Sequence, residues 1–388
     1  MVCAEILRLR SHAPYGKGVA RTRTVDACPG ALQTHQAADG PLARIRLPGG
    51  ALSATQLSAL AGAAVEFGSG ALELTARGNI QLRGLTDTVA VAEAVAAAGL
   101  LPSVSHERVR NIVASPLSGR CGGHADVRGL VAGLDRALCA DPRLAALPGR
   151  FWFGLDDGRG DIGGLATDIG VHLLSADCAA LLLAGRDTGV RLDHDAVVPT
   201  LVDVAATFLT VRDSAWRVAE LERPTALLDG MEATEPGGRT WPPATRPPVG
   251  WITQDDGRVT LGAGVPLGVL TARVAEYLVA LDAPVVITPW RSVLLGDLGE
   301  AAADAAVRVL APLGLVFDAQ SRWLAVSSCV GSPGCAHARA DVRADAAAAV
   351  DAPADGHRHF VGCERACGSP PVGQVLVATG DGYRQLRP

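Results

Sequence analysis

The 388-residue sequence predicts an α+β fold with two similar halves, each followed by an α/β segment. A glycine turn, a helical pattern, a strand, a short turn and a second strand occur in this order over residues 49–85 and again over residues 262–298. Two copies indicate a duplication related by a pseudo-twofold axis, because a solenoid needs more repeats. The matched residues are Thr75 with Thr288, Ile80 with Val293, and Leu85 with Leu298.

Each copy is expected to follow a strand, over residues 42–47 in the first half and 249–254 in the second. Residues 235–248 are rich in Pro and Gly, which is typical of a linker. The predicted segments are a first half-repeat (15–88), a first α/β domain (89–234), the linker (235–248), a second half-repeat (249–298) and a second α/β domain (299–388).

Hydrophobic periodicity places the elements of the two α/β domains. In the first domain it predicts helices over residues 124–139 and 195–210 and a strand over residues 151–156. In the second domain it predicts a helix over residues 300–313 and a final strand over residues 372–379.

Composition excludes several classes of protein. With 48% hydrophobic residues the chain has enough apolar side chains for a large core, and its net charge of -5 gives no general attraction to nucleic acid or to an anionic membrane. The alanine-rich stretch 89–101 contains Glu93 and ends at Pro102, so it predicts an ordinary helix instead of a membrane span, and no run approaches eighteen apolar residues. The N-terminal residues lack the apolar core of a signal peptide, and we expect a cytoplasmic protein without nucleic-acid or membrane partners.

Four of the nine cysteines lie near the C-terminus, as a C-x5-C pair (Cys329 and Cys335) and a C-x3-C pair (Cys363 and Cys367); we call them the cysteine quartet. An odd number of cysteines without a secretion signal argues against a disulfide framework, whereas four thiolates from two short loops suit a metal centre. Structural zinc prefers C-x2–4-C spacing, so we favour an iron–sulfur cluster, with zinc and unligated cysteines as the alternatives. Residues 336–350 are expected to form a helix whose positively polarised N-terminus favours the thiolate of Cys335.

Arginine side chains form a second group of candidate functional residues. Arg77 and Arg83 share one face of a predicted strand because they are an even number of residues apart. Arg108 and Arg110 share a face of another strand segment, and Arg150 precedes a third. A single such pair is typical of a solvated sheet edge, but three segments beside a cluster-binding region indicate a polyanion site. Because guanidinium groups form forked bonds with carboxylates, a polycarboxylate such as a tetrapyrrole would fit.

Two motifs join the quartet and the duplicated halves: TARGNIQLRG over residues 75–84 and RNIVASP over residues 110–116. Together these features resemble the sulfite/nitrite reductase superfamily over nearly the whole chain. The resemblance implies ferredoxin-like half-repeats related by a pseudo-twofold axis, with two α/β domains. It also implies a 4Fe–4S cluster on the cysteine quartet, in which Cys367 holds the position that bridges to sirohaem in those reductases.

In those reductases, cationic side chains bind the carboxylates of the tetrapyrrole. The resemblance implies this role for Arg77, Arg110 and Arg150. Arg83 shares the strand face of Arg77, so we expect it to bind substrate carboxylates as well. A further lysine of the superfamily falls near Trp152, and its replacement removes a cation from the centre that binds and reduces the anion.

Further motifs resemble one branch of the superfamily. The chain is short for an assimilatory reductase, and it carries ACPG at residues 27–30, DGPLAR at 39–44 and LPGG at 47–50. These features are similar to the precorrin-3B synthases of aerobic cobalamin (corrin) synthesis. The resemblance implies O2-dependent hydroxylation and lactone formation on precorrin-3A, with electrons from an external NADH- or ferredoxin-linked donor passing through the 4Fe–4S cluster.

The same resemblance implies a mononuclear non-haem iron, for which no ligand set is evident. His35, His106, His124 and His172 are candidates by residue type alone, and each is more typical of a structural or surface histidine. Sirohaem is not required for this chemistry. The alternatives are a sirohaem-dependent assimilatory sulfite or nitrite reductase, a non-catalytic electron carrier, and a tetrapyrrole-binding module. The duplicated scaffold is larger than a carrier needs, and a binding module needs no cluster.

Overall fold

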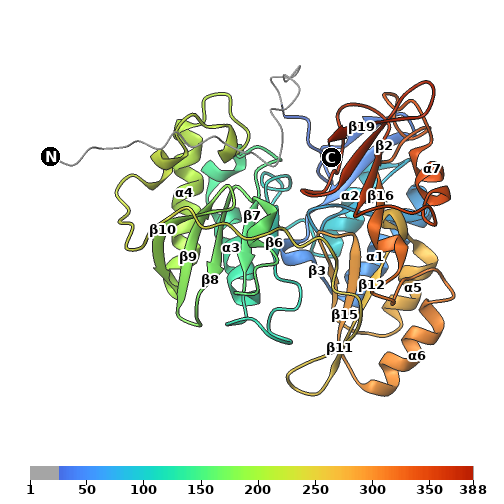
Figure 1. The fold of residues 1–388 in the computed structure, drawn as a ribbon, viewed down its shortest axis with the longest axis horizontal. Coiled ribbons are helices and arrows are strands. Elements are labelled where there is room, and N and C mark those ends of the chain that lie inside the picture. Colours follow the sequence, from blue (N-terminus) through green and yellow to red (C-terminus); the bar gives the residue numbers. More distant parts are fainter. Residues whose placement is uncertain (1–25, 388) are drawn as a thin grey trace.

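The computed structural model describes residues 26–387, in which the strands form four sheets (Figure 1). The first predicted segment begins at residue 15, so residues 15–25 of it lie outside the described part of the chain. In Figure 1 the unit drawn in green lies on one side, and the blue and orange halves lie beside the red C-terminal unit on the other. The predicted α+β class with duplicated halves is confirmed.

Each half of the duplication forms an antiparallel sheet that takes its fifth strand from the other half. The first sheet contains, in spatial order, β1 (His35–Ala37), β2 (Gly40–Ile45), β5 (Ile80–Leu82), β4 (Ala71–Leu74) and β13 (Val269–Thr271). The second contains β11 (Gly250–Thr253), β12 (Val259–Gly264), β15 (Ser292–Leu298), β14 (Val285–Ile287) and β3 (Ala51–Leu52). The exchanged strands pair through Leu270 with Leu72 and through Val285 with Leu52, which ties the halves together.

Helices α1 (Ala54–Phe67) and α5 (Ala272–Val279) pack against each other and share one hydrophobic core with both half-sheets. Ser53 begins α1 with a capping box, and the Thr271 side chain caps α5. Leu57 of α1 is completely buried, as the apolar spacing of the helix predicts. Two further helices, α2 (Thr88–Ala97) and α6 (Glu300–Leu310), follow the two half-repeats.

The predicted alignment of the halves is correct for the strands that follow the helices. Ile80 pairs with Ile45 on β2, and Val293 pairs with Ala263 on β12, so Ile80 and Val293 occupy the same place in their sheets. By these registers residue 44 corresponds to 262, and residue 46 to 264.

Before the helices, the predicted alignment is wrong. Gly49 corresponds to Leu267 and not to Gly262, because both lie in a 3-10 turn before the helix with a left-handed φ, 65° for Gly49 and 53° for Leu267. The shift arises because α5 has 8 residues and α1 has 14. For the same reason the strand predicted over 249–254, observed as β11, is the counterpart of β1, whereas β12 is the counterpart of β2.

The two α/β units share a topology that the sequence did not reveal. The first contains β6 (Ile112–Ala114), β7 (Phe153–Asp156), β8 (Ile169–Leu173), β9 (Cys178–Leu183) and β10 (Arg186–Asp193). The second contains β16 (Val326–Ser328), β17 (Arg358–Val361), β18 (Gln374–Ala378) and β19 (Tyr383–Arg387). In each unit the first three strands are parallel and the fourth is antiparallel. One helix, α3 (Arg128–Ala140) or α7 (Val342–Ala348), connects the first two strands.

Most elements predicted in these units are present with shifted ends. The helix predicted over 124–139 is α3, and the one predicted over 195–210 is α4 (Val197–Val211). The helix over 300–313 is α6, the strand over 151–156 is β7, and the strand over 372–379 is β18, which β19 follows as an unpredicted last strand.

One helical segment reaches the length and hydropathy of a membrane span, residues 194–211, which corrects the expectation that none does. Leu201, Val204 and Phe208 of this segment are fully buried in the core of the first α/β unit. Packing in that core accounts for the apolar composition of the segment.

Candidate functional site

The cysteine quartet gathers at one edge of the C-terminal sheet. Cys329 directly follows β16, and Cys363 follows β17 after one residue, so both lie at the carboxyl ends of adjacent parallel strands. The Cys329 N–H donates to the Phe360 carbonyl (2.9 Å), and the Gly362 N–H donates to the Cys329 sulfur (3.3 Å). This edge of a parallel sheet is where α/β proteins bind their ligands.

The four thiols influence one another but do not converge as zinc ligands do. Burial raises the pKa of the Cys329 thiol and of the Cys367 thiol, and neighbouring thiols of the quartet raise both further. In the part of the chain that the structure describes, no three of these sulfurs lie within 4.8 Å of one another. A tetrahedral zinc ion with Zn–S bonds of ~2.3 Å holds its sulfurs about 3.8 Å apart. The sulfurs of the quartet therefore lie farther apart than the ligands of a bound zinc ion do.

Cys335 does not begin a helix, contrary to the sequence-based expectation. The Ala338 N–H donates to the Cys335 carbonyl (3.0 Å) in a turn, and α7 begins only at Val342, capped by the Asp341 side chain. A helix N-terminus therefore provides no stabilisation to the Cys335 thiolate.

Arg83 joins the first half-sheet to the loop of the quartet. Its guanidinium forms a fork with Asp39 (2.9 and 2.8 Å) and donates a third bond to the carbonyl of Gly334 (2.9 Å), the residue before Cys335. Only 6% of Arg83 is exposed. Its charge is neutralised by Asp39, so its geometry supports an anchoring role instead of the predicted substrate contact.

Arg110 is also engaged within the protein. It forms a fork with Asp135 on α3, with two bonds of 2.7 Å, and donates to the Leu100 carbonyl (3.3 Å). Because these bonds occupy both sides of a buried guanidinium, the geometry of Arg110 does not support the predicted contact with substrate carboxylates.

Arg77 lies against Trp152, the residue at the position of the superfamily lysine. The Arg77 guanidinium is 5.0 Å from the Trp152 ring, and Arg217 lies 5.6 Å from the same ring. Asp168 accepts a bond of 2.6 Å from Arg217 and neutralises it, whereas the Arg77 guanidinium has, among the described residues, only the carbonyl of Gly149 as a hydrogen-bond partner (3.4 Å). Burial lowers the pKa of Arg77 to about 10, so it remains charged at neutral pH.

Arg44 is a candidate that the sequence analysis missed. Its guanidinium donates to the Gln81 side chain across the first half-sheet. Burial lowers the pKa of Arg44, the thiols of Cys28 and Cys367 oppose this effect, and Arg150 adds to it. Arg44 is therefore close both to the quartet and to Arg150, which is exposed beside Trp216.

Arg46 is the second missed candidate. Only 2% of it is exposed; Nε donates to the Arg108 carbonyl (3.2 Å) and Nη2 to the Pro29 carbonyl (3.1 Å), while Nη1 has no partner. Burial lowers the pKa of Arg46 well below its ordinary value, and Arg44 and Arg77 lower it further. The signal in the sequence was the even spacing of Arg44 and Arg46 on one strand.

Arg44, Arg46, Arg77 and Arg150 share one property: among the described residues, none has a carboxylate within 4.0 Å, whereas Arg83, Arg110 and Arg217 each have one. We call these four the unpaired arginines. Arg46 is buried, Arg44 and Arg77 are half-buried and Arg150 is exposed. A buried cation without an anion is unfavourable unless a ligand supplies the negative charge.

The second half-repeat has lost the corresponding cations. By the strand registers, Gly262, Gly264 and Trp290 stand where the first half has Arg44, Arg46 and Arg77. The unpaired arginines are thus a property of one half of the duplication, which argues for a ligand and not for a requirement of the fold.

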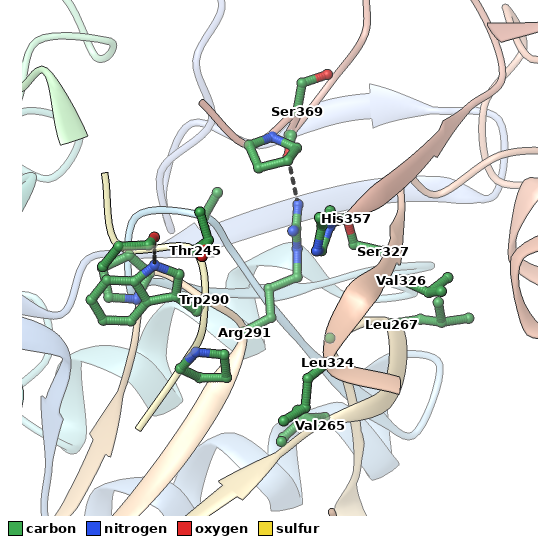
Figure 2. Close-up of a pocket in the computed structure, with 18 of the residues that line it drawn as sticks. Thr245, Val265, Leu267, Trp290, Arg291, Leu324, Val326, Ser327, His357 and Ser369 are labelled. Carbon is green, nitrogen blue, oxygen red and sulfur yellow. Dashed lines mark hydrogen bonds between the residues drawn. The ribbon is translucent and has the colours of Figure 1, made fainter. Parts of the chain in front are cut away.

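A cavity that is partly open to solvent occupies the corresponding place in the second half (Figure 2). It is lined by apolar and aromatic side chains with a few polar groups: Trp152, Trp290, Arg291, Trp323, Ser327 and His357. Figure 2 shows His357 beside Arg291 and Ser327. Burial and the positive charge of Arg291 together lower the pKa of His357 to about 4, so the imidazole is neutral at pH 7.

Comparison with known proteins relates this geometry to a family. Residues 35–98 match the nitrite/sulfite reductase ferredoxin-like half domain, and this segment contains Arg44, Arg46 and Arg77. The structure of the Mycobacterium tuberculosis NirA protein superposes with a TM-score of 0.73 at 18% identity, covering 89% of this chain and 77% of that chain. The fold is that of the nitrite and sulfite reductases.

Two curated relatives refine the resemblance. A precorrin-3B synthase of Sinorhizobium sp. is 28% identical over 385 residues, which covers 92% of this chain and 81% of that protein. A ferredoxin–nitrite reductase of Synechococcus elongatus is 36% identical over 127 residues, 30% of this chain and 25% of that protein. The chain resembles precorrin-3B synthase over nearly its whole length, and the comparisons support an enzyme of the oxidoreductase type.

The candidate histidines do not gather into an iron site. His106 bonds to Ser103 (2.8 Å) and to the carbonyl of Asp141 (3.0 Å), which is a structural arrangement. His172 lies 3.1 Å from Asp156, but the carboxylate of Asp156 already accepts four backbone N–H bonds.

The acidic cluster that contains Asp156 is the only group of three potential metal ligands that converges within 4.8 Å in the described chain; its other members are Asp157 and Asp161. Arg159 forms a fork with Asp157, so two of the three carboxylates are satisfied without a metal. Neither the candidate histidines nor the acidic cluster fits a mononuclear iron site.

Proposed function

We propose that the chain is a precorrin-3B synthase that binds precorrin-3A on the unpaired arginines. The observation that carries the proposal is that, among the described residues, four arginines have no carboxylate partner, and one of them, Arg44, lies close to Cys367. Tetrapyrrole carboxylates supply the missing negative charge, and forked guanidinium contacts fix the orientation of the macrocycle.

In the proposed reaction, one oxygen atom of O2 enters the substrate as a hydroxyl group and the other leaves as water. A carboxylate of the substrate adds to the neighbouring ring carbon and closes the lactone. Two electrons and two protons balance the reduction of the second oxygen atom. The electrons come from an external NADH- or ferredoxin-linked donor.

We propose that the cysteine quartet holds a 4Fe–4S cluster. The donor set fits, since four thiolates from two loops meet at one sheet edge with more room than zinc needs. When bound, such a cluster supplies electrons one at a time. Arg83 holds one of its loops through the Gly334 carbonyl, and Arg44 places positive charge near Cys367.

The second candidate is a sirohaem-dependent assimilatory sulfite or nitrite reductase, favoured by the local identity to a ferredoxin–nitrite reductase. Trp152 argues against it, because the indole brings no charge to the position of the superfamily lysine. Arg77 compensates only in part, since it lies on the face of that ring. We also propose that the synthase is cytoplasmic and that its domains have the limits predicted from the sequence.

Anaerobic purification followed by iron and acid-labile sulfide analysis tests the cluster. Titration with precorrin-3A, followed by absorbance, tests the arginines. The Arg44→Gln and Arg150→Gln variants are expected to bind about tenfold or more weakly, because each loses a charge-assisted contact. Arg308→Gln removes an exposed arginine paired with Asp304 and is the matched control, expected to bind as the wild type does.

Two outcomes would overturn the proposal. Equal binding by all variants would remove the arginines from the substrate site. A sirohaem absorption band together with sulfite or nitrite turnover would establish the second candidate instead.

A further inference from the structure

A chain of hydrogen bonds runs from the cavity to the backbone of Cys367. His359 on β17 is fully buried, and its Nε2 lies 3.0 Å from the Cys367 carbonyl. Because a carbonyl only accepts, Nε2 carries the hydrogen, and Nδ1 lies 2.7 Å from the Ser327 hydroxyl oxygen. The same hydroxyl lies 2.7 Å from Nε2 of His357, which lines the cavity.

Arg291 holds the next carbonyl of the same loop. Its Nη2 donates to the Gly368 oxygen (2.8 Å), as the dashed line in Figure 2 shows. Gly368 has a φ of 75°, and a Cβ at this position would lie 2.6 Å from Nη2 of Arg291. Glycine is therefore needed both for the backbone conformation and for the close approach of the guanidinium. Two successive carbonyls are thus each held by a side chain, that of Cys367 by His359 and that of Gly368 by Arg291, which lines the cavity.

The duplication shows that this chain is not a requirement of the fold. The backbone bond from Cys329 to Phe360 has its counterpart in the bond from Ser115 to Leu155 (3.1 Å). In this register the positions of Ser327, His357 and His359 are held in the first α/β unit by Val113, Trp152 and Gly154. None of these three side chains can form such a chain, and the sheet is nevertheless the same.

We propose that His359, Ser327 and Arg291 are positioning residues, which set the geometry of Cys367 in the cluster. Through the hydrogen bonds of Ser327 and His359, a change at His357 in the cavity alters that geometry. The proposal deepens the proposed function and rests on its assignment of a cluster to the quartet. It adds that the cavity and the cluster are coupled through a defined path of three side chains. The reduction potential of an iron–sulfur cluster depends on hydrogen bonding around its ligands, so a change in this path changes the potential.

The test compares single substitutions in the iron-loaded full chain. Ser327→Ala breaks the chain without touching the quartet, and Ser328→Ala is the matched control, because the Ser328 hydroxyl is buried next to it and has no partner. His359→Gln keeps an N–H donor for the Cys367 carbonyl but loses the connection to Ser327, whereas His359→Ala loses both. The readouts are the midpoint potential, the electron paramagnetic resonance spectrum of the reduced cluster and the rate of iron release to a chelator.

We expect His359→Ala to release iron on the order of tenfold faster than the wild type, the factor associated with one buried hydrogen bond. His359→Gln should restore the release rate. Ser327→Ala should shift the midpoint potential and the spectrum, whereas Ser328→Ala should leave both unchanged.

The outcomes distinguish failure of the proposed function from failure of the positioning role. A wild-type protein that binds no iron–sulfur cluster under anaerobic loading would overturn the proposed function itself. A wild-type protein with a full cluster, whose potential, spectrum and iron release are the same in Ser327→Ala and His359→Ala, would overturn only the positioning role. If His359→Ala does not fold, His359→Gln and Ser327→Ala still decide the question.

Discussion

Replacing Arg77 by glutamine is expected to stabilise the free protein and, at the same time, to weaken binding of precorrin-3A. Burial, together with Arg217 and Arg44, lowers the pKa of Arg77 from its ordinary value to about 10. One pKa unit is worth about 1.4 kcal/mol, so this difference corresponds to about 3 kcal/mol against the folded state. The penalty is present in full below pH 10, where the guanidinium is charged in both states, and it disappears as the pH rises above 10.

The net effect is smaller because Arg77→Gln also loses the contact with the Trp152 ring, worth about 0.5–1 kcal/mol. We therefore expect the free energy of unfolding to rise by about 2 kcal/mol. Loss of one charge-assisted contact, about 1.5–3 kcal/mol, should raise the Kd for precorrin-3A by about tenfold to 150-fold.

Arg110→Gln is the matched control, since it makes the same substitution at a paired arginine. Asp135 would lose its partner, so the free energy of unfolding should fall by about 3 kcal/mol while the Kd stays unchanged. Urea unfolding followed by circular dichroism measures the first quantity, and anaerobic absorbance titration the second. This prediction is contradicted if Arg77→Gln destabilises the protein as Arg110→Gln does and leaves the affinity for precorrin-3A unaltered.

Two further predictions concern single contacts. Arg83→Met should lower the free energy of unfolding by about 3 kcal/mol, because Asp39 and the Gly334 carbonyl lose their donor, and it should accelerate iron release to a chelator; unchanged release kinetics would show that Arg83 does not anchor the loop. Burial, with a smaller contribution from Asp156, raises the pKa of Asp161 to about 7, so its contribution to stability is present below pH 4 and is lost as the pH rises from about 4 to 7. Asp161→Asn should flatten the pH dependence of unfolding in that range, and an unchanged pH profile would contradict the raised pKa.

Local patterns were sufficient to predict the duplication. Even spacing in strands and apolar spacing in helices depend on neighbours in the sequence, so the helix predicted over residues 300–313 begins at Glu300 as expected. A strand-like segment precedes Cys363, as the sequence predicts, whereas the parallel pairing of β16 with β17 that brings Cys329 to the same edge is a long-range contact.

Tertiary partners could not be predicted from spacing. Arg83 and Arg110 resemble Arg77 in the sequence, but acids 44 and 25 residues away neutralise them in the fold. Arg44 and Arg46 have an even spacing in the sequence, but only the register of the duplicated sheets shows that glycine stands at both corresponding positions. The exchange of strands between the halves is likewise a long-range pairing that no local pattern specifies.

The most direct test of the central claim is a single turnover of the reduced, iron-loaded protein with precorrin-3A and oxygen-18-labelled dioxygen, followed by mass spectrometry of the tetrapyrrole. The account predicts that the product gains one labelled oxygen atom and that Arg77→Gln lowers the yield at subsaturating substrate. A product without label, from protein that contains its full complement of cluster iron, would contradict the account.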